Sequence, residues 1–320
     1  MKKEGDNSSA ENRSEGLVEE ILRLKKERNA VIMAHYYQRD EIQEIADFIG
    51  DSLALARQAQ KIDADVIVMC GVHFMGETAK ILCPDKTVLI PDPEAGCSLA
   101  DSCDPVEFEK FVKAHPDHTV VSYVNTSAAV KAVTDIVVTS GNARKVIDSL
   151  PADEKIIFGP DKNLGGYINS VTGREMLLWN GACHVHDRFS IERIQEMKKE
   201  HPGAKILVHP ECRRPLQLIA DKVGSTAALL EFAANDDAQD FIVVTESGIL
   251  FEMRRKCPGK NFMAAPAEDA ECQCNNCEYM KLNTLVKLRD CLRDMKPEIT
   301  VDPEIAERAV RPIERMLALS

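Results

Sequence analysis

The chain repeats one pattern of residues three times, and this repeat limits its fold more than any other feature. Each copy starts with a short apolar run that ends just before a reference residue, which is His35, Tyr123 or His209. The copies begin 88 and 86 residues apart, and each contains a serine 16 or 17 residues after its reference residue. These serines are Ser52, Ser140 and Ser225. Such a chain should fold into three similar modules around one axis, with equivalent chain ends close together.

Within each copy, continuous apolar runs of three to five residues alternate with segments of helical character. The runs 66–69, 156–158 and 242–244 are the strongest examples. Such runs are typical of parallel strands that helices bury on both faces. The sequence therefore predicts an α/β protein with three homologous three-layer αβα domains, each with a parallel sheet, around a pseudo-threefold axis.

The repeat also sets the expected domain boundaries. The polar segment 1–16 is expected to be a disordered tail. Three αβα domains should then occupy residues 17–105, 106–190 and 191–279. The last segment, 280–320, has the pattern of two helices, and we expect these helices to pack back on the first domain.

Charge and composition exclude several classes of protein. The net charge of −12 argues against a nucleic-acid-binding protein, which would normally carry a basic patch. No run approaches the roughly 20 apolar residues that a membrane-spanning helix needs. The chain has 11 cysteines and no apolar signal core near its start. We therefore expect a cytoplasmic protein with reduced thiols rather than structural disulfides.

Polar residues gather where the expected strands end. In open α/β sheets, ligands bind beyond the carboxyl ends of the strands. The ends of the first strands carry His35, Tyr37, Tyr123, Val124, Asn125, His209, Pro210 and Glu211. The ends of the second strands carry Ser52, Ser140, Ser225 and Thr226. Because the three copies should face one axis, we expect these residues to line one buried pocket.

A cysteine follows each copy of the repeat, at Cys97, Cys183 and Cys277. Their separations of 86 and 94 residues are unlike those of zinc sites, which usually pair thiols within a short loop. Iron–sulfur clusters accept distant ligands because the fold assembles them. Three thiolates on a four-iron cluster leave one iron open to act as a Lewis acid. A local metal site that uses Cys272 and Cys274 with Cys277 is the rival interpretation.

These residues together resemble the quinolinate synthase family over roughly residues 29–316. The resemblance rests chiefly on Ala34-His35-Tyr36-Tyr37, Tyr123-Val124-Asn125-Thr126-Ser127-Ala128, Gly181-Ala182-Cys183-His184-Val185-His186 and Cys277-Glu278-Tyr279-Met280. It implies a [4Fe–4S] cluster on Cys97, Cys183 and Cys277. It also implies the reaction, in which iminoaspartate condenses with dihydroxyacetone phosphate to give quinolinate, with loss of phosphate and water, in NAD biosynthesis. An enzyme that oxidises L-aspartate would supply the iminoaspartate.

This chemistry needs acid–base groups and anchors for two carboxylates and a phosphate. Tyr37 and Glu211 are our candidates for acid–base catalysis, with Glu211 as the base that deprotonates the condensing intermediates. His35 and His209 are candidates for both catalysis and substrate binding. The other expected substrate-binding residues are the strand-end residues named above and His186. The serines and Thr226 precede helices, whose N-termini attract anions.

Two other classes of function stay open at this point. A non-catalytic iron–sulfur electron carrier or redox sensor would use the loop with Cys272, Cys274 and Cys277. It would be indifferent to substitutions at Tyr37 or Glu211. A zinc-stabilised binding module would hold zinc in place of iron.

Overall fold

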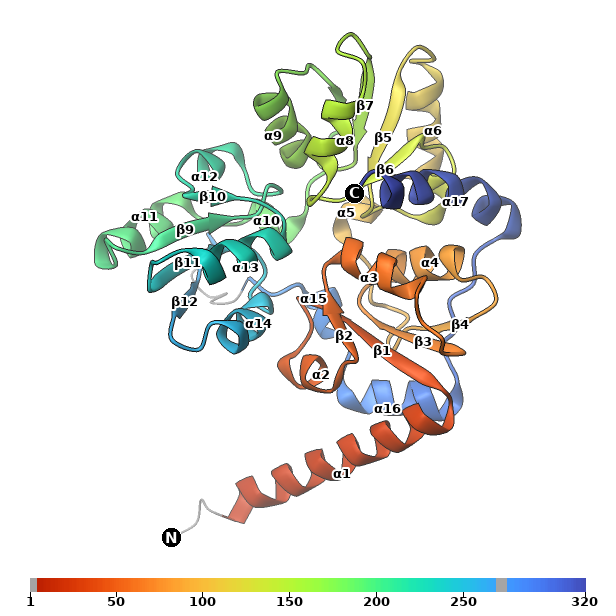
Figure 1. Ribbon diagram of the computed structural model, residues 1–320, viewed down its shortest axis with the longest axis vertical. Coiled ribbons are helices and arrows are strands. Elements are labelled where there is room, and N and C mark those ends of the chain that lie inside the picture. The colour runs from red at the N-terminus through yellow and green to blue at the C-terminus, as the bar shows by residue number, and fades with distance from the viewer. Residues whose placement is uncertain (1–4, 269–274) are drawn as a thin grey trace.

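The computed structural model describes residues 5–268 and 275–320 of the chain. Figure 1 shows three lobes around a common centre, with a long N-terminal helix projecting at one end. Each lobe contains one four-stranded sheet with helices against it. We call these lobes modules 1, 2 and 3 in chain order.

The three sheets share one topology. In each sheet the strands lie in the order second, first, third, fourth, and all neighbours are parallel. Module 1 contains β1 (Ala30–His35), β2 (Phe48–Gly50), β3 (Val66–Cys70) and β4 (Thr87–Leu89). Module 2 contains β5 (Thr119–Tyr123), β6 (Ile136–Val138), β7 (Ile156–Gly159) and β8 (Leu177–Leu178). Module 3 contains β9 (Lys205–Val208), β10 (Lys222–Val223), β11 (Asp240–Val244) and β12 (Asn261–Ala264). The expected α/β class with three parallel sheets is confirmed.

Helices follow the strands in the same repeating order. Module 1 contains α2 (Asp40–Ile45), α3 (Ser52–Ala59), α4 (His73–Leu82) and α5 (Ser98–Asp101). Module 2 contains α6 (Pro105–Lys113), α7 (Ala128–Lys131), α8 (Ala143–Ser149), α9 (Lys162–Thr172) and α10 (His184–Asp187). Module 3 contains α11 (Ile191–Glu200), α12 (Arg214–Leu218), α13 (Thr226–Asn235), α14 (Ile249–Lys256) and α15 (Glu278–Lys281). No helix in residues 5–268 and 275–320 has both the length and the apolar character needed to cross a membrane.

One aspartate in each module docks the second strand onto the first. Its carboxylate accepts a first-strand N–H at 2.8 Å, and its own N–H donates to the carbonyl of that residue at 2.9 Å. The pairs are Asp47 with Ile32, Asp135 with Val120, and Asp221 with Ile206. The repeat therefore extends from the order of elements to individual hydrogen bonds.

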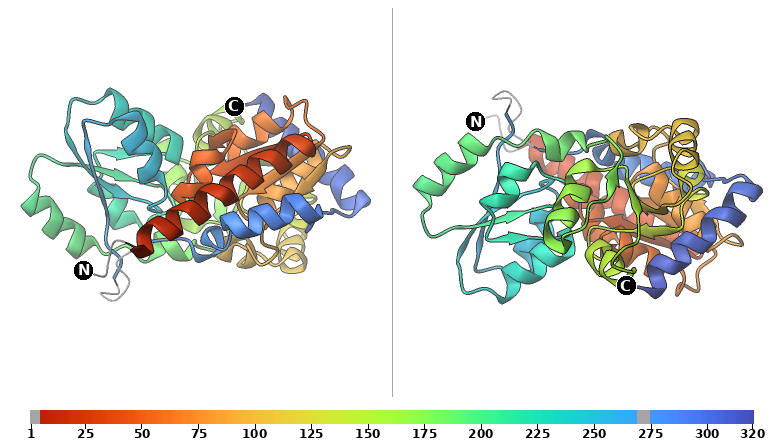
Figure 2. Two further views of the ribbon diagram at one scale, coloured as in Figure 1. Left: turned by 90° about the horizontal axis from the view of Figure 1, so that it is seen from below. Right: turned by 90° about the horizontal axis from the view of Figure 1, so that it is seen from above.

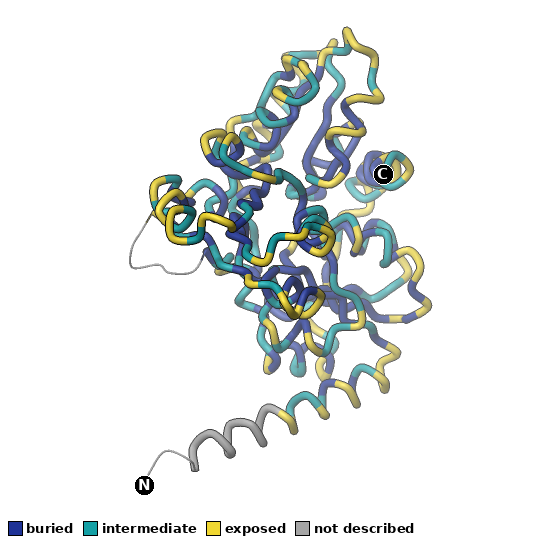
Figure 3. The backbone as a smooth tube through the Cα atoms, turned by 60° about the vertical axis from the view of Figure 1, so that its left-hand side comes forward, coloured by how far each residue is buried: buried dark blue, intermediate teal, exposed yellow. Residues whose placement is uncertain are grey.

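The core follows the apolar runs of the sequence. Strands β3 and β7 are buried along their whole length, and β11 is buried after its first residue. The largest hydrophobic cluster joins modules 1 and 2, with Met33 and Phe158 among its members. Figure 3 shows buried backbone concentrated inside the lobes and exposed backbone on their outer turns. The two modules therefore share one core rather than touching only at their surfaces.

Two of the three terminal helices differ from the sequence-based expectation. Helix α1 (Gly5–Glu27) begins inside the segment 1–16 that was expected to be a disordered tail, and no proline interrupts this helix. Helix α16 (Leu285–Asp294) packs along α1 beside module 1 (Figure 2). Helix α17 (Pro303–Ala318) contacts β6 and α7 of module 2 as well as α4 of module 1. Helix α17 bridges the two modules because its apolar side enters their shared core. The expected domain boundaries stay a prediction.

Two adjacent glycines in α9 give opposite predictions. A Cβ at Gly165 would lie 2.6 Å from Leu178 Cδ2 and 2.9 Å from Phe158 Cδ1, whereas a Cβ at Gly166 would meet no atom within 4 Å. Gly165→Ala should lower the free energy of unfolding by about 1–3 kcal/mol through overpacking. Gly166→Ala should raise it by about 0.5–1 kcal/mol because alanine favours the helix. Urea denaturation measures both changes, and shifts of the same sign would contradict the packing of α9 on β8.

Candidate active site and metal centre

One cavity lies where the three modules meet, beyond the carboxyl ends of their first strands. His35 and Tyr37 reach it from module 1, Tyr123 from module 2, and His209 and Glu211 from module 3. The other expected site residues that line it are Ser52, Cys97, Val124, Asn125, Ser140, Cys183, His186, Thr226 and Cys277. The structure therefore brings into one place residues that the sequence distributes over all three copies of the repeat.

Two of the expected substrate-binding residues, Ser225 and Pro210, are not part of this lining. Ser225 caps α13, where its hydroxyl accepts the N–H of Ala228 at 3.3 Å. The carbonyl of Pro210 accepts a hydrogen bond from the side chain of Gln217 at 2.9 Å. Both residues therefore support the backbone near the cavity instead of facing it.

Ser52 and Ser140 differ from Ser225 in their relation to the helices that follow. Asp51, not Ser52, is the N-cap of α3, and its carboxylate accepts the N–H of Ala54. Asn142, not Ser140, is the N-cap residue of α8. The helix-capping interpretation therefore applies to Ser225 alone, and the other two serines stand in the cavity wall.

Hydroxyl groups at the strand ends join one module to another. The hydroxyl of Tyr37 in module 1 hydrogen-bonds Thr226 at 2.8 Å and Thr245 at 2.7 Å, both in module 3. The hydroxyl of Tyr123 in module 2 donates to Oε1 of Glu211 in module 3 at 2.5 Å. These contacts fix the side chains of the site relative to one another across the module boundaries.

The two strand-end histidines are held as neutral imidazoles. Nδ1 of His35 accepts the N–H of Tyr37 at 3.1 Å, and Nδ1 of His209 accepts the N–H of Glu211 at 3.4 Å. Burial lowers the pKa of each imidazole to about 3. The proton of each neutral ring is therefore on Nε2, and in His209 this atom lies 3.2 Å from Ser140 Oγ. Neutral Nε2–H donors favour a role in binding substrate oxygens over a role in proton transfer.

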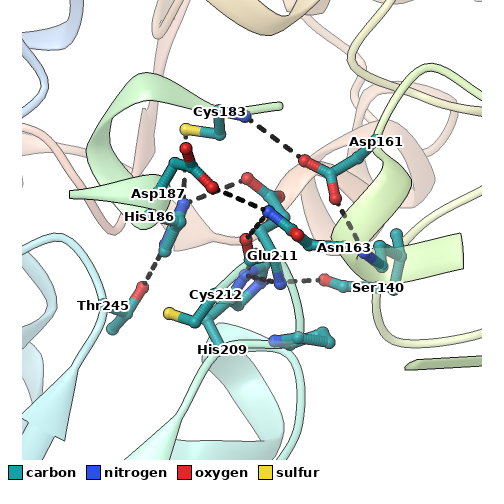
Figure 4. Close-up of polar contacts among 12 residues, drawn as sticks. Ser140, Asp161, Asn163, Cys183, His186, Asp187, His209, Glu211, Cys212 and Thr245 are labelled. Carbon is teal, nitrogen blue, oxygen red and sulfur yellow. Dashed lines mark hydrogen bonds and ion pairs between the residues drawn. The ribbon is translucent and has the colours of Figure 1, made fainter. Parts of the chain in front are cut away.

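Glu211 is the buried carboxylate at the centre of the site (Figure 4). Its Oε2 lies 3.0 Å from Nδ1 of His186. Burial opposes ionisation of Glu211, but His186 and the hydrogen bonds from His186 and Tyr123 outweigh it and lower the pKa of Glu211 to about 2. Burial, and then the charge of Glu211, raise the pKa values of Tyr37 and Tyr123 well above the usual value. Glu211 is therefore ionised at neutral pH.

A buried side chain in each module supports the backbone behind the strand end. This side chain belongs to the residue eight positions after the reference residue. It donates a hydrogen bond to the backbone carbonyl of the residue three positions after the reference residue. The pairs are Gln43 with Gln38, Lys131 with Thr126, and Gln217 with Cys212. The three donors are at most 6% exposed, so these contacts are shielded from water. Module 2 differs in using an ammonium group for this contact, and its Nζ also lies 5.4 Å from the centroid of the Phe74 ring.

The three cysteines occupy the same position in their modules. Cys97, Cys183 and Cys277 are the N-cap residues of α5, α10 and α15, so each thiol stands at the start of a short helix. Burial raises the pKa of Cys97 to about 12 and of Cys277 to about 11. Burial also raises the pKa of Cys183, and the charges of Glu211, Cys97 and Cys277 add to this effect. The three thiols line the same cavity.

The surroundings of these thiols suit a metal centre. Burial keeps them protonated, and a bound cation would reverse that balance and hold them as thiolates. All nine cysteines within the described ranges are free, and only Cys97, Cys183 and Cys277 among them line the cavity. Soft thiolate ligands are typical of zinc, copper(I) and iron–sulfur sites.

A second ligand set overlaps the first. One ligand atom each from Cys183, His186 and Glu211 lie within 4.8 Å of one another, which is close enough to bind a single metal ion. This set shares Cys183 with the three-thiol set, so the two could not be filled independently. Cys272 and Cys274 of the rival loop lie outside the described residues.

The residues that follow the three cysteines form a chain around the same point. Oγ of Ser98 lies 2.5 Å from Nδ1 of His184, and Nε2 of His184 lies 3.6 Å from Oε2 of Glu278. Each module contributes one residue. Ser98 and His184 therefore join the starts of α5 and α10, and the Glu278 carboxylate at the start of α15 lies beside them.

Sequence reasoning missed three charged residues beside the site. Asp161 accepts the N–H of Cys183 at 3.3 Å, and Glu246 accepts the N–H of Cys277 at 3.2 Å. Nζ of Lys281 lies 3.1 Å from Oε1 of Glu246. Asp161 and Glu246 both lie two residues after the third strand of their module. An alignment of the three copies of the repeat at that position could have identified Asp161 and Glu246 from the sequence.

Comparisons with known proteins agree with this arrangement. A family model described as quinolinate synthetase A protein matches residues 19–318. Quinolinate synthase from Chloroherpeton thalassium is 54% identical to the chain over 304 residues, which cover 95% of this chain and 94% of that protein. Quinolinate synthase from a Synechococcus strain is 54% identical over 300 residues, 94% of each chain. The one from a Synechocystis strain is 54% identical over 304 residues, 95% of each chain.

Substitutions at Lys131 test the backbone support in module 2. Lys131→Gln should keep a donor for the carbonyl of Thr126, as Gln43 and Gln217 do in the other modules. Lys131→Met should leave that buried carbonyl without its side-chain donor. Lys131→Met should therefore be less stable than Lys131→Gln by about 1–3 kcal/mol. Urea denaturation gives the difference, and equal stability of the two variants would contradict the proposed support.

Removal of His209 tests the neutral state of its imidazole. Because its pKa is about 3 in the folded chain and about 6.5 in the unfolded chain, only the unfolded chain gains a proton as the pH falls below 6.5. Folding stability contributed by this group is thus lost between pH 6.5 and pH 3. Between pH 7 and pH 5.5 the free energy of unfolding should fall in both metal-free proteins. The fall should be about 1.3 kcal/mol smaller in His209→Gln than in the natural chain. Identical losses in denaturant titrations at the two pH values would show that the imidazole titrates normally.

Proposed function

The chain belongs to the quinolinate synthase family, and we propose that it condenses iminoaspartate with dihydroxyacetone phosphate to form quinolinate in NAD biosynthesis. Phosphate and water are lost in this reaction. Similarity along nearly the whole chain to quinolinate synthases supports the proposal. The observation that carries it is one cavity that combines a cysteine from each module with the polar ends of all three first strands.

We propose that Cys97, Cys183 and Cys277 hold a [4Fe–4S] cluster in this cavity. Three thiols at equivalent helix starts, one from each module and all in the wall of one cavity, match the ligand requirements of such a cluster. No other cysteine of the described ranges lines the cavity, so three protein ligands are available there. When bound in this way, the cluster supplies a Lewis acid at its iron without a protein ligand.

We propose that the remaining residues divide into anion-binding groups and one base. The substrates bring two carboxylates and a phosphate into a protein with a net charge of −12. The cavity offers neutral donors for these groups, including Nε2–H of His35 and of His209 and the hydroxyls of Ser52 and Ser140. Hydroxyl and N–H donors at helix starts bind anions without a lysine or arginine cluster. This explains how an acidic protein can hold anionic substrates.

Glu211 is the proposed base for the deprotonations that lead to the aromatic ring. It is ionised at neutral pH, so it can accept a proton from carbon or nitrogen. Anionic substrates bound beside it would raise its pKa, which brings the carboxylate closer to the basicity that proton abstraction needs. Tyr37, whose hydroxyl is held by Thr226 and Thr245, is the proposed partner that orients or protonates substrate oxygen.

The electron-carrier alternative is less well supported by the same geometry. An electron carrier needs an enclosed cluster with its coordination complete and has no use for acid–base groups facing it. Here Glu211, Tyr37 and His186 share the cavity with the three thiols. The alternative zinc module would leave this set of groups without a role.

The proposed reaction implies a partner enzyme, and the free thiols indicate a compartment. An enzyme that oxidises L-aspartate is the proposed supplier of iminoaspartate. We also propose that the protein works in the cytoplasm, because the nine cysteines within its described ranges are free thiols, as in a reducing compartment.

Activity assays under anaerobic conditions test the proposed function. Iron-loaded protein should form quinolinate from iminoaspartate and dihydroxyacetone phosphate. Glu211→Gln should keep its iron and sulfide content but lose about 10²–10⁴-fold in kcat, since it removes the base. Cys183→Ser should lose both cluster and activity, whereas Cys291→Ser, a buried cysteine in α16 away from the cavity, should keep both. Absence of quinolinate from a fully iron-loaded sample, or a cluster that survives both Cys97→Ser and Cys183→Ser, would refute the proposal.

A further inference from the structure

The copies of the repeat differ at one position next to the cysteines. Two residues after the third strand of each module stand Val72, Asp161 and Glu246. The two acidic residues are fully buried, at 0% exposure. Burial of a carboxylate is costly unless hydrogen bonds or charges compensate for it. The partners of these carboxylates therefore indicate why modules 2 and 3 carry them.

Asp161 joins the start of α9 to the cysteine of module 2 (Figure 4). Its Oδ1 accepts the N–H of Leu164 at 2.7 Å, which is the ordinary contact of a helix N-cap. Its Oδ2 accepts the backbone N–H of Cys183 at 3.3 Å. A serine or asparagine could cap the helix equally well, because capping needs only one oxygen. The second oxygen is what distinguishes aspartate at this position.

Glu246 makes the corresponding contact in module 3 with a different local structure. Its Oε2 accepts the N–H of Gly248 at 2.7 Å, and its Oε1 accepts the N–H of Cys277 at 3.2 Å. The ammonium of Lys281 lies 3.1 Å from Oε1 and also donates to the carbonyl of Tyr37 at 2.6 Å. Two side chains of different length thus reach the same target, the amide of the module's cysteine.

We infer that Asp161 and Glu246 are positioning residues that hold Cys183 and Cys277 in the orientation needed to ligate the cluster. The inference rests on the proposed function, because it assumes that these cysteines are ligands. Each carboxylate fixes the peptide plane in front of the sulfur, so the Cα–Cβ direction of the cysteine is set before metal binds. Hydrogen-bonding partners behind a metal ligand commonly control affinity in this way. Val72 offers no acceptor, so Cys97 in module 1 is held without such a contact.

Amide substitutions separate this role from helix capping. Asp161→Asn keeps an oxygen for Leu164, but its NH₂ group cannot accept the N–H of Cys183. Glu246→Gln removes the second acceptor at Cys277 in the same way. Asp302→Asn is the matched control, because Asp302 caps α17 through the N–H groups of Glu304 and Ile305 and touches no cysteine.

The measurement is the rate at which anaerobically reconstituted protein loses its cluster to an iron chelator. Asp161→Asn and Glu246→Gln should each lose it about 10-fold faster than the natural chain, and Asp302→Asn at the natural rate. The electron paramagnetic resonance spectrum of the reduced cluster should change in the first two variants only. Unchanged rates and spectra in both variants, or the same acceleration in Asp302→Asn at an equal loss of thermal stability, would overturn the inference.

Lys281 needs a control of its own, because its ammonium pairs with Glu246. Glu246→Gln leaves the half-buried Lys281 without its carboxylate, so the double variant Glu246→Gln/Lys281→Met is measured as well. It should fold and still lose its cluster quickly, and retention of the cluster at the natural rate would count against the role of Glu246. If the natural chain itself binds no cluster, the proposed function fails. If it binds one that the variants retain equally well, only the positioning role fails.

Discussion

The carboxyl ends of three parallel sheets converge on one cavity, and the rest of the structure depends on this constraint. Parallel sheets place their ligand-binding residues at one edge, and three edges that face one another exclude water from those residues. His35, Tyr123 and His209 are accordingly at most 6% exposed. Buried polar groups need hydrogen-bonding partners. The partners come from neighbouring modules, as in Tyr123 with Glu211 and His209 with Ser140.

Support for this arrangement lies one layer behind the cavity and repeats with the fold. The aspartates hold each second strand against the first, and the buried donors Gln43, Lys131 and Gln217 bond to backbone just past the first-strand ends. Because these contacts fix the backbone, the side chains that line the cavity are not needed to hold it in place. The polar residues at and just after the strand ends can therefore be fixed in place.

Departures from the repeat give the cavity its chemical asymmetry. Only module 3 has a carboxylate at the end of its first strand, which is Glu211, and only module 2 has a tyrosine as its reference residue. Modules 2 and 3 place acidic residues behind their cysteines, whereas module 1 has Val72 there. The proposed reaction joins two chemically different substrates, which need different subsites that a strictly symmetric cavity could not provide. The repeat thus supplies the scaffold and its exceptions supply the chemistry.

The sequence by itself determined the α/β class, the parallel sheets and the position of one cysteine after each copy of the repeat. It could do so because apolar runs and their spacing along the chain are local properties. The same local pattern placed His35, Tyr123 and His209 at strand ends. It could not assign the partners of these residues, since Tyr123 and Glu211 are 88 residues apart and meet only when modules 2 and 3 pack together. Tertiary structure alone decided the bridging position of α17, the neutral state of the two histidines and the contacts of Asp161 and Glu246 with the cysteine amides. Each of these depends on burial or on distant neighbours, and neither is encoded by any single segment of the chain.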